Sequence, residues 1–527
     1  MIWVALHLPA LPLESFSATL PEGACTGPLA LFDAQRSAAV VTAANAAAQA
    51  EGVKPGLRRA TALALAPQLV HGTACAAREA QALAAVAHVA LAFTPSVTCC
   101  NPGVDVADSG GHHVLLEVQA SLRRFGGPGR SLPQLLAQLR AALAPLQHRI
   151  HIASAPTAQG AALLARTGDD LHCADLGTLA QRLDAAPVWL LGPGRAHWEA
   201  LQGMGLRSVA DLRRLPRAGL ARRFGEALLD EIDRALGARP DPRDRVTLPA
   251  VFEARLELFA RADTTEQVLH GAALLLARLV AWARAQQAQV RGFTLQMQHE
   301  PRHRHNARTP AASTLAVALA EPSCDAEHLR VLLRERLARL QLPAPTLELR
   351  LHCADVAQRA PPNGELFASA GSERDGLVRL IERLQARLGN DRVQRLQPAA
   401  DHRPERGGVL RAAEALPAGA GRPCKPAAPP SDRAAEALRP VWLLPHPQPL
   451  PEQHSRPLLD GRPLQLLCGP ERIEAGWWDA ALAERDYFIA QAHDGALVWV
   501  YRARLPLLAL PSGQEQWQGW FLQGRFA

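Results

Sequence analysis

The chain has 527 residues, of which 48% are hydrophobic and 20% are charged. This length exceeds one ordinary hydrophobic core and the composition excludes a wholly disordered protein, so we expect roughly three to five folded units. We find no uncharged apolar run of about 18 residues and no basic segment leading into an apolar one, which argues against a membrane span, a membrane partner or a signal peptide. We therefore expect a soluble, cytoplasmic protein.

Nine cysteines are scattered along the chain and never form a C-x-x-C pair. This spacing argues against a structural zinc site or a disulfide framework, and we expect no metal and no cofactor. The formal net charge is +7, and nearly all of the positive charge is arginine, because Lys54 and Lys425 are the only lysines. Arginine is suited to phosphate contacts, although a GC-rich coding sequence gives the same bias without any function.

Residues 1–172 are predicted to form an α/β or α+β core. The opening MIWVALHLPALPL is typical of a buried strand, and the alanine-rich residues 36–93 are predicted to be helical apart from a turn at 52–56. Further strands are expected at 114–118 and in HRIHIAS at 148–154, with a helix between them.

Residues 173–246 change to short helices separated by glycines. The string LGPGR at 191–195 predicts a turn whose amides face outward at a helix N-terminus, where a phosphate can bind without its base being read. A second glycine pair, Gly203 and Gly205, precedes Arg207. The two glycine pairs together form a helix-hairpin-helix pattern. The alternative is an ordinary helix cap. The DNA-binding residues predicted here are Gly192, Gly194, Arg195, Gly203, Gly205 and Arg207.

Residues 247–356 predict the order β-α-β-β-α-β, which is typical of a small sheet covered by helices. The loop PRHRHNAR at 301–308 lies between two of these strands. It is a candidate phosphate contact, with a solvated loop as the alternative. The DNA-binding residues predicted in this segment are Arg291, Arg302 and Arg304.

The last third of the chain contains three different segments. Residues 357–404 hold the string NGELF at 363–367 and an amphipathic helix at 375–389. Residues 405–439 are rich in Pro, Gly, Ala and Arg and are predicted to be a flexible linker. Residues 440–527 contain six of the ten tryptophans and are predicted to be a compact β-rich module, with the tryptophans in its core or at an interface.

The order of these segments, with GVKPGL at 52–57 and SLRRFGG at 121–127, resembles Y-family DNA polymerases over about residues 1–355. The resemblance implies a multidomain α+β fold with a palm and fingers at 1–172 (fingers about 36–80), a thumb at 173–246 and a little finger at 247–356. The strings GPERIEAGWWD, RDYF and WFLQGRFA near the end of the chain resemble the polymerase-like subunit of a bacterial damage-induced mutagenesis cassette.

Polymerases of this family hold two metal ions with three carboxylates. Aligning the family's first-strand glutamate with Glu14 puts Ala5 and His7 at the two aspartates, and the second motif puts His112 and His113 at an Asp-Glu pair. Neutral imidazoles cannot do the charge work of carboxylates towards Mg²⁺, a hard cation that prefers oxygen. We therefore expect a polymerase fold with no catalytic residues.

Two alternatives concern this same region. A register shift that brings Asp105 and Asp108 into the site would turn the apolar run at 114–118 to the wrong face. A metal site built from the histidines would have only one of His112 and His113 on the face of His7, because adjacent strand residues point to opposite faces. Contacts to the incoming triphosphate are missing as well. The family's Y-E-A-R-x-x-G-V string corresponds to residues 46–53, which lack its tyrosine and arginine.

The remaining implications concern partners. NGELF resembles the sliding-clamp-binding pentapeptide Q-x-(D/S)-L-F, with Asn363, Glu365, Leu366 and Phe367 as the binding residues and Asn363 departing from glutamine. The resemblance further implies primer-template DNA, a RecA-like accessory subunit and an error-prone C-family DNA polymerase as partners. We expect a noncatalytic scaffold for translesion synthesis in the SOS response, nucleoid-associated after DNA damage. The alternatives are an active translesion polymerase and a general helix-hairpin-helix DNA-binding protein.

Overall fold

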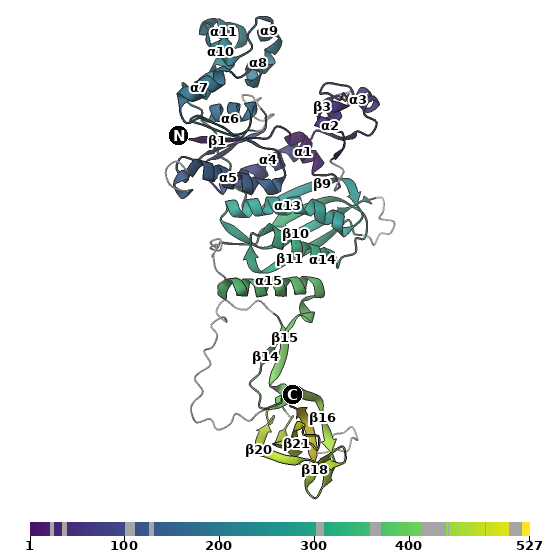
Figure 1. The fold of residues 1–527 in the computed structure, drawn as a ribbon. Helices are drawn as coiled ribbons and strands as arrows, with labels where there is room; N and C mark the ends of the chain where they lie inside the picture. Colours follow the sequence, from purple (N-terminus) through teal and green to yellow (C-terminus); the bar gives the residue numbers. More distant parts are fainter. Residues whose placement is uncertain are drawn as a thin grey trace. The chain divides into compact units, whose positions relative to one another are not determined.

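The structure is a computed structural model (Figure 1). The chain divides into two compact units, Met1–Arg387 (unit 1) and Leu388–Ala527 (unit 2). The structure describes residues 1–21, 26–33, 39–100, 111–125, 131–301, 310–358, 370–413, 439–440, 442–479, 481–504 and 519–526.

The first sheet of unit 1 has the strand order β5-β6-β1-β7-β8. Its strands are Trp3–His7 (β1), Val97–Cys100 (β5), His113–Glu117 (β6), His151–Ala155 (β7) and Leu171–His172 (β8), and its helices are Leu11–Ser17 (α1), Ala76–Leu91 (α4), Ser131–Leu143 (α5) and Ala158–Thr167 (α6). Neighbouring strands are antiparallel except for β7 and β8. The strands predicted at 114–118 and 148–154 are therefore present as β6 and β7, within a few residues of their expected positions.

The residues of β1 alternate between two cores, as the period of a strand requires. Val4 and Leu6 belong to the core that α4 and α5 cover, whereas Ala5 belongs to the core that α6 covers. Figure 1 shows α6 on the opposite side of β1 from α4 and α5. The sheet is thus covered on both faces, and a side chain on β1 is assigned to one face by its position alone.

The prediction of helices throughout 36–93 is wrong in two places. Val41–Ala44 (β3) and Val70–Thr73 (β4) are strands that flank Leu29–Phe32 (β2) in a sheet of order β3-β2-β4. All of β2 is buried, so both of its edges need backbone partners, and β3 and β4 provide them. Ala46–Ala50 (α2) and Arg59–Leu65 (α3) are helical, and the predicted turn between them contains Gly52 and Gly56 at positive φ.

Short helices follow from residue 176 to residue 235, as the glycine spacing predicts. They are Leu176–Asp184 (α7), Gly192–Ala196 (α8), Trp198–Gly203 (α9), Val209–Arg213 (α10), Arg217–Phe224 (α11) and Glu226–Ala235 (α12). The Asp175 carboxylate accepts a hydrogen bond from the Thr178 amide at the start of α7, and Gly225, at φ +84°, separates α11 from α12. The apolar sides of these helices share one core with α6, which attaches them to the first sheet.

Residues 252–353 have the β-α-β-β-α-β order that their pattern predicts. Phe252–Ala262 (β9), Ala288–His299 (β10), Ala312–Ser323 (β11) and Thr346–Cys353 (β12) pair antiparallel in the order β11-β10-β12-β9, and Val356–Gln358 (β13) pairs with β10. Thr265–Ala285 (α13) and Ala326–Leu337 (α14) share the core of this sheet. Among the described residues, α13 is the one helix long and apolar enough to cross a membrane, but 61% of its apolar window is buried, as expected of a core helix.

The predicted flexible linker at 405–439 is wrong at its beginning. Ala370–Leu388 (α15) leads into a hairpin of Gln394–Pro398 (β14) and Gly408–Ala412 (β15). A 3-10 turn at Pro404–Arg406 precedes β15, so ordered structure continues to residue 413. Residues 414–438 of the expected linker lie outside the described residues.

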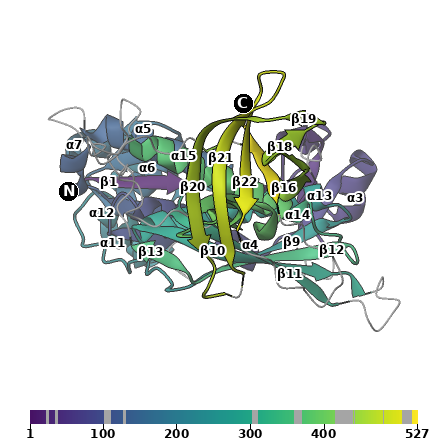
Figure 2. The same cartoon turned by 90° about the horizontal axis from the view of Figure 1, so that it is seen from below.

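The end of unit 2 is the β-rich module that the sequence predicts (Figure 2). Its main sheet has the order β16-β23-β22-β21-β20, and a small sheet has the order β17-β18-β19. Trp499 and Trp520 are buried, whereas Trp442, Trp477 and Trp478 are exposed, so the core and surface interpretations each describe part of the set. The strands are Trp442–Leu450 (β16), Glu452–Gln453 (β17), Arg456–Leu459 (β18), Arg462–Pro463 (β19), Gln465–Ala475 (β20), Ala483–Gln491 (β21), Leu497–Ala503 (β22) and Trp520–Arg525 (β23).

Candidate functional site

Three histidines meet at one end of the first sheet of unit 1. In the register of the strands, His7 on β1 lies opposite His113 on β6 and opposite His151 on β7. Ala5, two residues earlier on β1, lies between Leu115 and Ala153. Residues two apart on a strand share a face, so Ala5 and the three histidines all lie on the α6 side of the sheet.

Each of these imidazoles is bound to the backbone through its Nδ1 atom. The Nδ1–carbonyl distances are 3.2 Å from His7 to His112, 2.9 Å from His113 to Gly111 and 3.3 Å from His151 to Ala165. Because a carbonyl oxygen only accepts hydrogen bonds, these contacts assign a proton to the Nδ1 atom of each ring. The cluster is therefore oriented by contacts of each ring with the backbone.

The pKa values of this end of the sheet favour the neutral form. Burial, together with the charges of His113 and Arg166, lowers the pKa of His7 from 6.5 to about 3. Burial, with His113 adding to it, lowers the pKa of His112 to about 4, although its Nε2 lies 3.4 Å from a carboxylate oxygen of Glu79 on α4. At neutral pH both rings are therefore uncharged.

The side chains present do not fit the pair of magnesium ions that the resemblance to Y-family polymerases implies. Ala5 offers only a methyl group, and imidazole nitrogens are poor replacements for the oxygen ligands that Mg²⁺ prefers. Within the described ranges, no group of three His, Cys, Asp or Glu side chains could hold a metal ion.

The register of β6 argues against the shifted register that would bring Asp105 and Asp108 into the site. Val114 and Leu116 face the core under α4 and α5, so β6 is not in the shifted register that would bring in upstream aspartates. Asp105 and Asp108 themselves lie outside the described residues. His113 shares the face of His7, as the alternation of strand residues predicts for one of the two adjacent histidines.

Glu14, aligned with the first-strand glutamate of the family, lies on α1. Its carboxylate accepts a hydrogen bond from the Arg149 amide at 3.0 Å and lies 3.2 Å from the Nδ1 atom of His148. Its observed contacts therefore hold α1 to the segment that precedes β7.

The outward-facing turn predicted at Gly192 and Gly194 is not found. Both glycines are buried within α8, and the Gly192 amide donates to Glu231 of α12 at 2.9 Å. A Cβ atom on Gly194 would lie 2.3 Å from the Val188 carbonyl oxygen. The protein's own carboxylate takes the place expected for a phosphate, so the prediction for these two glycines is corrected to a packing role.

The second glycine pair forms an exposed hairpin between α9 and α10. A Cβ atom on Gly203 or Gly205 would meet nothing within 4 Å, and Gly205 has φ +78°. The amides of Arg207 and Ser208 both donate to Asp211, at 3.1 and 3.0 Å. These two amides are therefore engaged, which leaves the exposed Arg207 side chain as the candidate phosphate contact of this hairpin.

The other predicted binding residues are separated from this hairpin in the sequence. Arg195 is exposed on α8 and Arg291 is exposed on β10. DNA binding by Arg302 and Arg304 and clamp binding by residues 363–367 stay predictions. The residues concerned lie outside the described ranges, namely Arg302, Arg304, Asn363, Glu365, Leu366 and Phe367.

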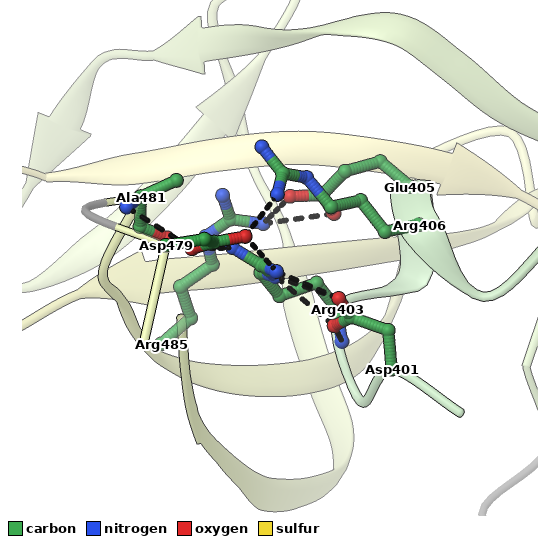
Figure 3. Close-up of polar contacts among 7 residues, drawn as sticks. All are labelled: Asp401, Arg403, Glu405, Arg406, Asp479, Ala481 and Arg485. Carbon is green, nitrogen blue, oxygen red and sulfur yellow. Dashed lines mark hydrogen bonds and ion pairs between the residues drawn. The ribbon is translucent and has the colours of Figure 1, made fainter. Parts of the chain in front are cut away.

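Sequence reasoning missed a cluster of charged side chains in unit 2 (Figure 3). Arg403 is 2% exposed and binds Asp401 and Asp479 in a bidentate manner, and it also donates to the Ala481 carbonyl oxygen at 2.9 Å. These contacts raise the pKa of Arg403 and lower the pKa of both carboxyls to about 2. The charge run at 401–406 is visible in the sequence, but Asp479 is 76 residues away, so the pairing could not be inferred.

The Arg403 cluster supports an exposed aromatic turn. The Arg403 guanidinium lies 5.5 Å from the ring centroid of Trp478, which is T-stacked on Trp477 at 5.3 Å. Gly476 has φ +86°, and a Cβ atom there would lie 2.2 Å from the Ala481 carbonyl oxygen. The string GWWD therefore codes for a fixed turn that leaves Trp477 78% exposed.

Comparison with known proteins extends the resemblance. No protein-family model matches the chain. Two curated proteins named ImuB, from two strains of Caulobacter vibrioides, are each 29% identical to it over 496 residues, covering 90% of this chain and 100% of theirs. The chain is similar to ImuB over nearly its whole length. This confirms the resemblance that its C-terminal strings predict, and because unit 1 ends at Arg387, the similarity to ImuB reaches into unit 2.

Solved structures similar to the chain include DinB from Sulfolobus solfataricus and an insertion ternary complex of Dbh DNA polymerase. Each is 14% identical to it with a TM-score of 0.38, and the matches cover 67% and 68% of this chain and 98% and 100% of theirs. The mixed α+β class is confirmed. The assignment of segments to palm, fingers, thumb and little finger stays a prediction.

Proposed function

We propose that the chain is a noncatalytic, Y-family polymerase-like scaffold in bacterial translesion DNA synthesis. In this proposal unit 1 holds primer-template DNA near damage and a clamp-binding segment tethers the chain. An error-prone C-family polymerase, recruited with a RecA-like accessory subunit, performs the extension. The similarity to ImuB and the sequence resemblance to Y-family polymerases support it. A cytoplasmic, nucleoid-associated location after damage forms part of the same proposal.

The observation that carries the proposal is the chemistry of the first sheet. Phosphoryl transfer by two metal ions needs anionic ligands that hold the cations and offset the charge that develops during the reaction. At the corresponding positions this chain has Ala5 and the histidines His7, His112 and His113, and partial burial lowers the pKa of His7 and His112. Losing one such group commonly costs orders of magnitude in rate, and here the whole set is replaced.

Weak contacts are sufficient for a scaffold, because tethering raises the effective concentration of the attached components. Arg207 and Arg291 are exposed on different elements and offer phosphate contacts that depend on salt and not on base sequence. The segment at 363–367 supplies an apolar Leu-Phe pair for the clamp. Each contact alone is modest, and the proposal requires that they act together.

The test is reconstituted lesion bypass with the full chain, a sliding clamp loaded on primed DNA and the C-family polymerase. We expect bypass to rise at least about tenfold when the chain is added, in line with the gain from tethering. A Leu366→Ala/Phe367→Ala variant should lose that gain. The matched control is Leu396→Ala/Leu410→Ala, which removes two exposed apolar side chains from the β14–β15 hairpin. Equal bypass with and without the chain would contradict the proposal.

A further inference from the structure

Helix α15 carries a row of exposed leucines along one face. Leu377, Leu380, Leu384 and Leu388 are 47%, 53%, 37% and 52% exposed. Their spacing of three, four and four residues places them on one stripe of the helix, as in the seam of a two-stranded coiled coil. Four large apolar side chains in one row differ from the scattered exposed leucines of an ordinary surface. We call this row the leucine stripe.

The opposite face of α15 packs against α14 and the sheet of order β11-β10-β12-β9, so the leucine stripe cannot turn inward. Val378 and Ala386 are buried, and the carboxylate of Glu382 is 7% exposed. Glu382 accepts hydrogen bonds from the amides of Ala320 and Glu321 and lies 2.8 Å from the Nε2 atom of His328 on α14. Rotating the helix would break these bonds and take Val378 and Ala386 out of the core, which is costly.

One border of the leucine stripe is basic. Arg383 and Arg387 follow Leu380 and Leu384 by three residues and so lie along the same edge. Arg383 lies 3.6 Å from Glu335 of α14, and Arg379, one turn earlier, lies 3.2 Å from Asp325. Arg387 is exposed, and no ion pair within the described part of the chain is found for it. The edge therefore has cationic charge available to a partner.

We propose that the leucine stripe of α15 is a docking site for an acidic amphipathic helix of another protein. Leucines of that helix would pack between those of the stripe, and its acidic flank would face Arg387. In the sequence, the stripe residues lie outside the segment at 363–367 and outside residues 440–527, to which the proposed function assigns partners. The proposal therefore adds a third attachment point that is independent of DNA and of the clamp.

Two other occupants fit less well. A second copy of the chain would bring the arginine-bordered stripe against itself, so the same positive edges would repel. A membrane surface favours a helix with a wide free apolar face, whereas here the face opposite the stripe is buried in protein and Arg379 and Arg383 are held by acidic partners. Charge complementarity therefore selects an acidic helix.

The experiment measures binding of the full chain to two synthetic helical peptides of equal length, each with leucines at coiled-coil spacing. One carries glutamates beside the leucines and the other carries lysines. We expect the glutamate peptide to bind at least about tenfold more tightly, because opposite charges meet across the interface. Leu380→Asp/Leu384→Asp should reduce its affinity by about tenfold or more, whereas Leu396→Asp/Leu410→Asp on the hairpin should leave it unchanged.

A second variant keeps the test valid if the two aspartates disturb folding. Arg387→Glu leaves the leucines in place and should narrow the difference between the two peptides several-fold. Equal binding of both peptides, no binding of either, or binding that the variants do not change would overturn the proposal. So would self-association, or binding to phosphatidylglycerol vesicles, that Leu380→Asp/Leu384→Asp abolishes, because the stripe would then serve a second copy or a lipid surface.

Discussion

A carboxylate and an imidazole differ above all in the charge that they carry at neutral pH. At the end of β1 the buried histidines hold their protons on Nδ1 against backbone carbonyls, and burial keeps His7 and His112 neutral. The sequence alone predicted which residues stand at these positions. It could not predict that His151 joins the cluster. That follows from the pairing of β1 with β7, which places His151 opposite His7 although the two are 144 residues apart in the sequence.

Acid should destabilise unit 1 through these histidines. The pKa values of His7 and His112 are about 3 and about 4 in the folded chain, against 6.5 when unperturbed, so between these values the unfolded state binds more protons. The contribution of these rings to the free energy of unfolding is therefore fully present above about pH 6.5 and decreases as the pH is lowered. Each titrating ring lowers the folding equilibrium constant by about tenfold per pH unit in this range. Urea unfolding from pH 7.5 to pH 4.5 measures this slope.

The histidine variants test the assignment. His7→Asn should make unfolding of unit 1 less sensitive to acid, whereas His493→Asn on the surface of unit 2 should not. An unchanged slope in His7→Asn would show that other groups cause the acid sensitivity.

Glycine positions distinguish packing from binding. Gly194→Ala should lower the free energy of unfolding by about 2 kcal/mol, because the new Cβ atom would clash with the Val188 backbone. Gly203→Ala is the matched control, since nothing lies near its Cβ position, and it should change stability by less than about 1 kcal/mol. Chemical denaturation of both variants measures the difference, and similar losses in the two would contradict the packing role.

At the scale of elements, hydrophobic periodicity predicted the β-α-β-β-α-β order of residues 252–353. Glycine spacing predicted the short helices, and the tryptophan-rich composition predicted the β-rich end of unit 2. The prediction failed for β3 and β4, because each is a strand of four residues inside an alanine-rich segment of helical composition and is fixed as a strand by pairing with the buried β2. It also failed for the start of the linker, where the hairpin β14–β15 depends on pairing between residues that a turn separates. Both failures are tertiary pairings that override local propensity.

The helix-hairpin-helix element offers a prediction about DNA binding. Arg207→Ala should weaken binding of primer-template DNA by about threefold to tenfold at low salt and reduce the slope of log affinity against log salt by about one. Arg502→Ala on β22 of unit 2 is the control and should change neither quantity. Fluorescence anisotropy between 50 and 200 mM salt, roughly the range in which such contacts weaken, measures both. An unchanged slope in Arg207→Ala would remove this hairpin from the DNA-binding surface.

At the scale of the whole molecule, the chain consists of two units. The stability of unit 2 depends on a contact between residues that are far apart in the sequence. Arg403 joins the turn before β15 to the turn after β20. Arg403→Ala should lower the melting temperature of unit 2 and leave the transition of unit 1 in place, because Asp401 and Asp479 would then be close together without their shared cation. Arg439→Ala, which removes an exposed pair with Glu471, is the control and should have little effect. Calorimetry of the full chain separates the transitions, and a single unchanged profile would contradict this role.

The most direct test of the scaffold account is primer extension by the purified full chain with Mg²⁺ and all four deoxynucleoside triphosphates. An active Y-family polymerase on the same primer-template serves as the positive control. The account predicts no extension above background even when the chain is equimolar with DNA, because Ala5 and histidines stand where the family has its metal-binding carboxylates. Extension that increases with the amount of chain and disappears in Asp105→Asn/Asp108→Asn would contradict it.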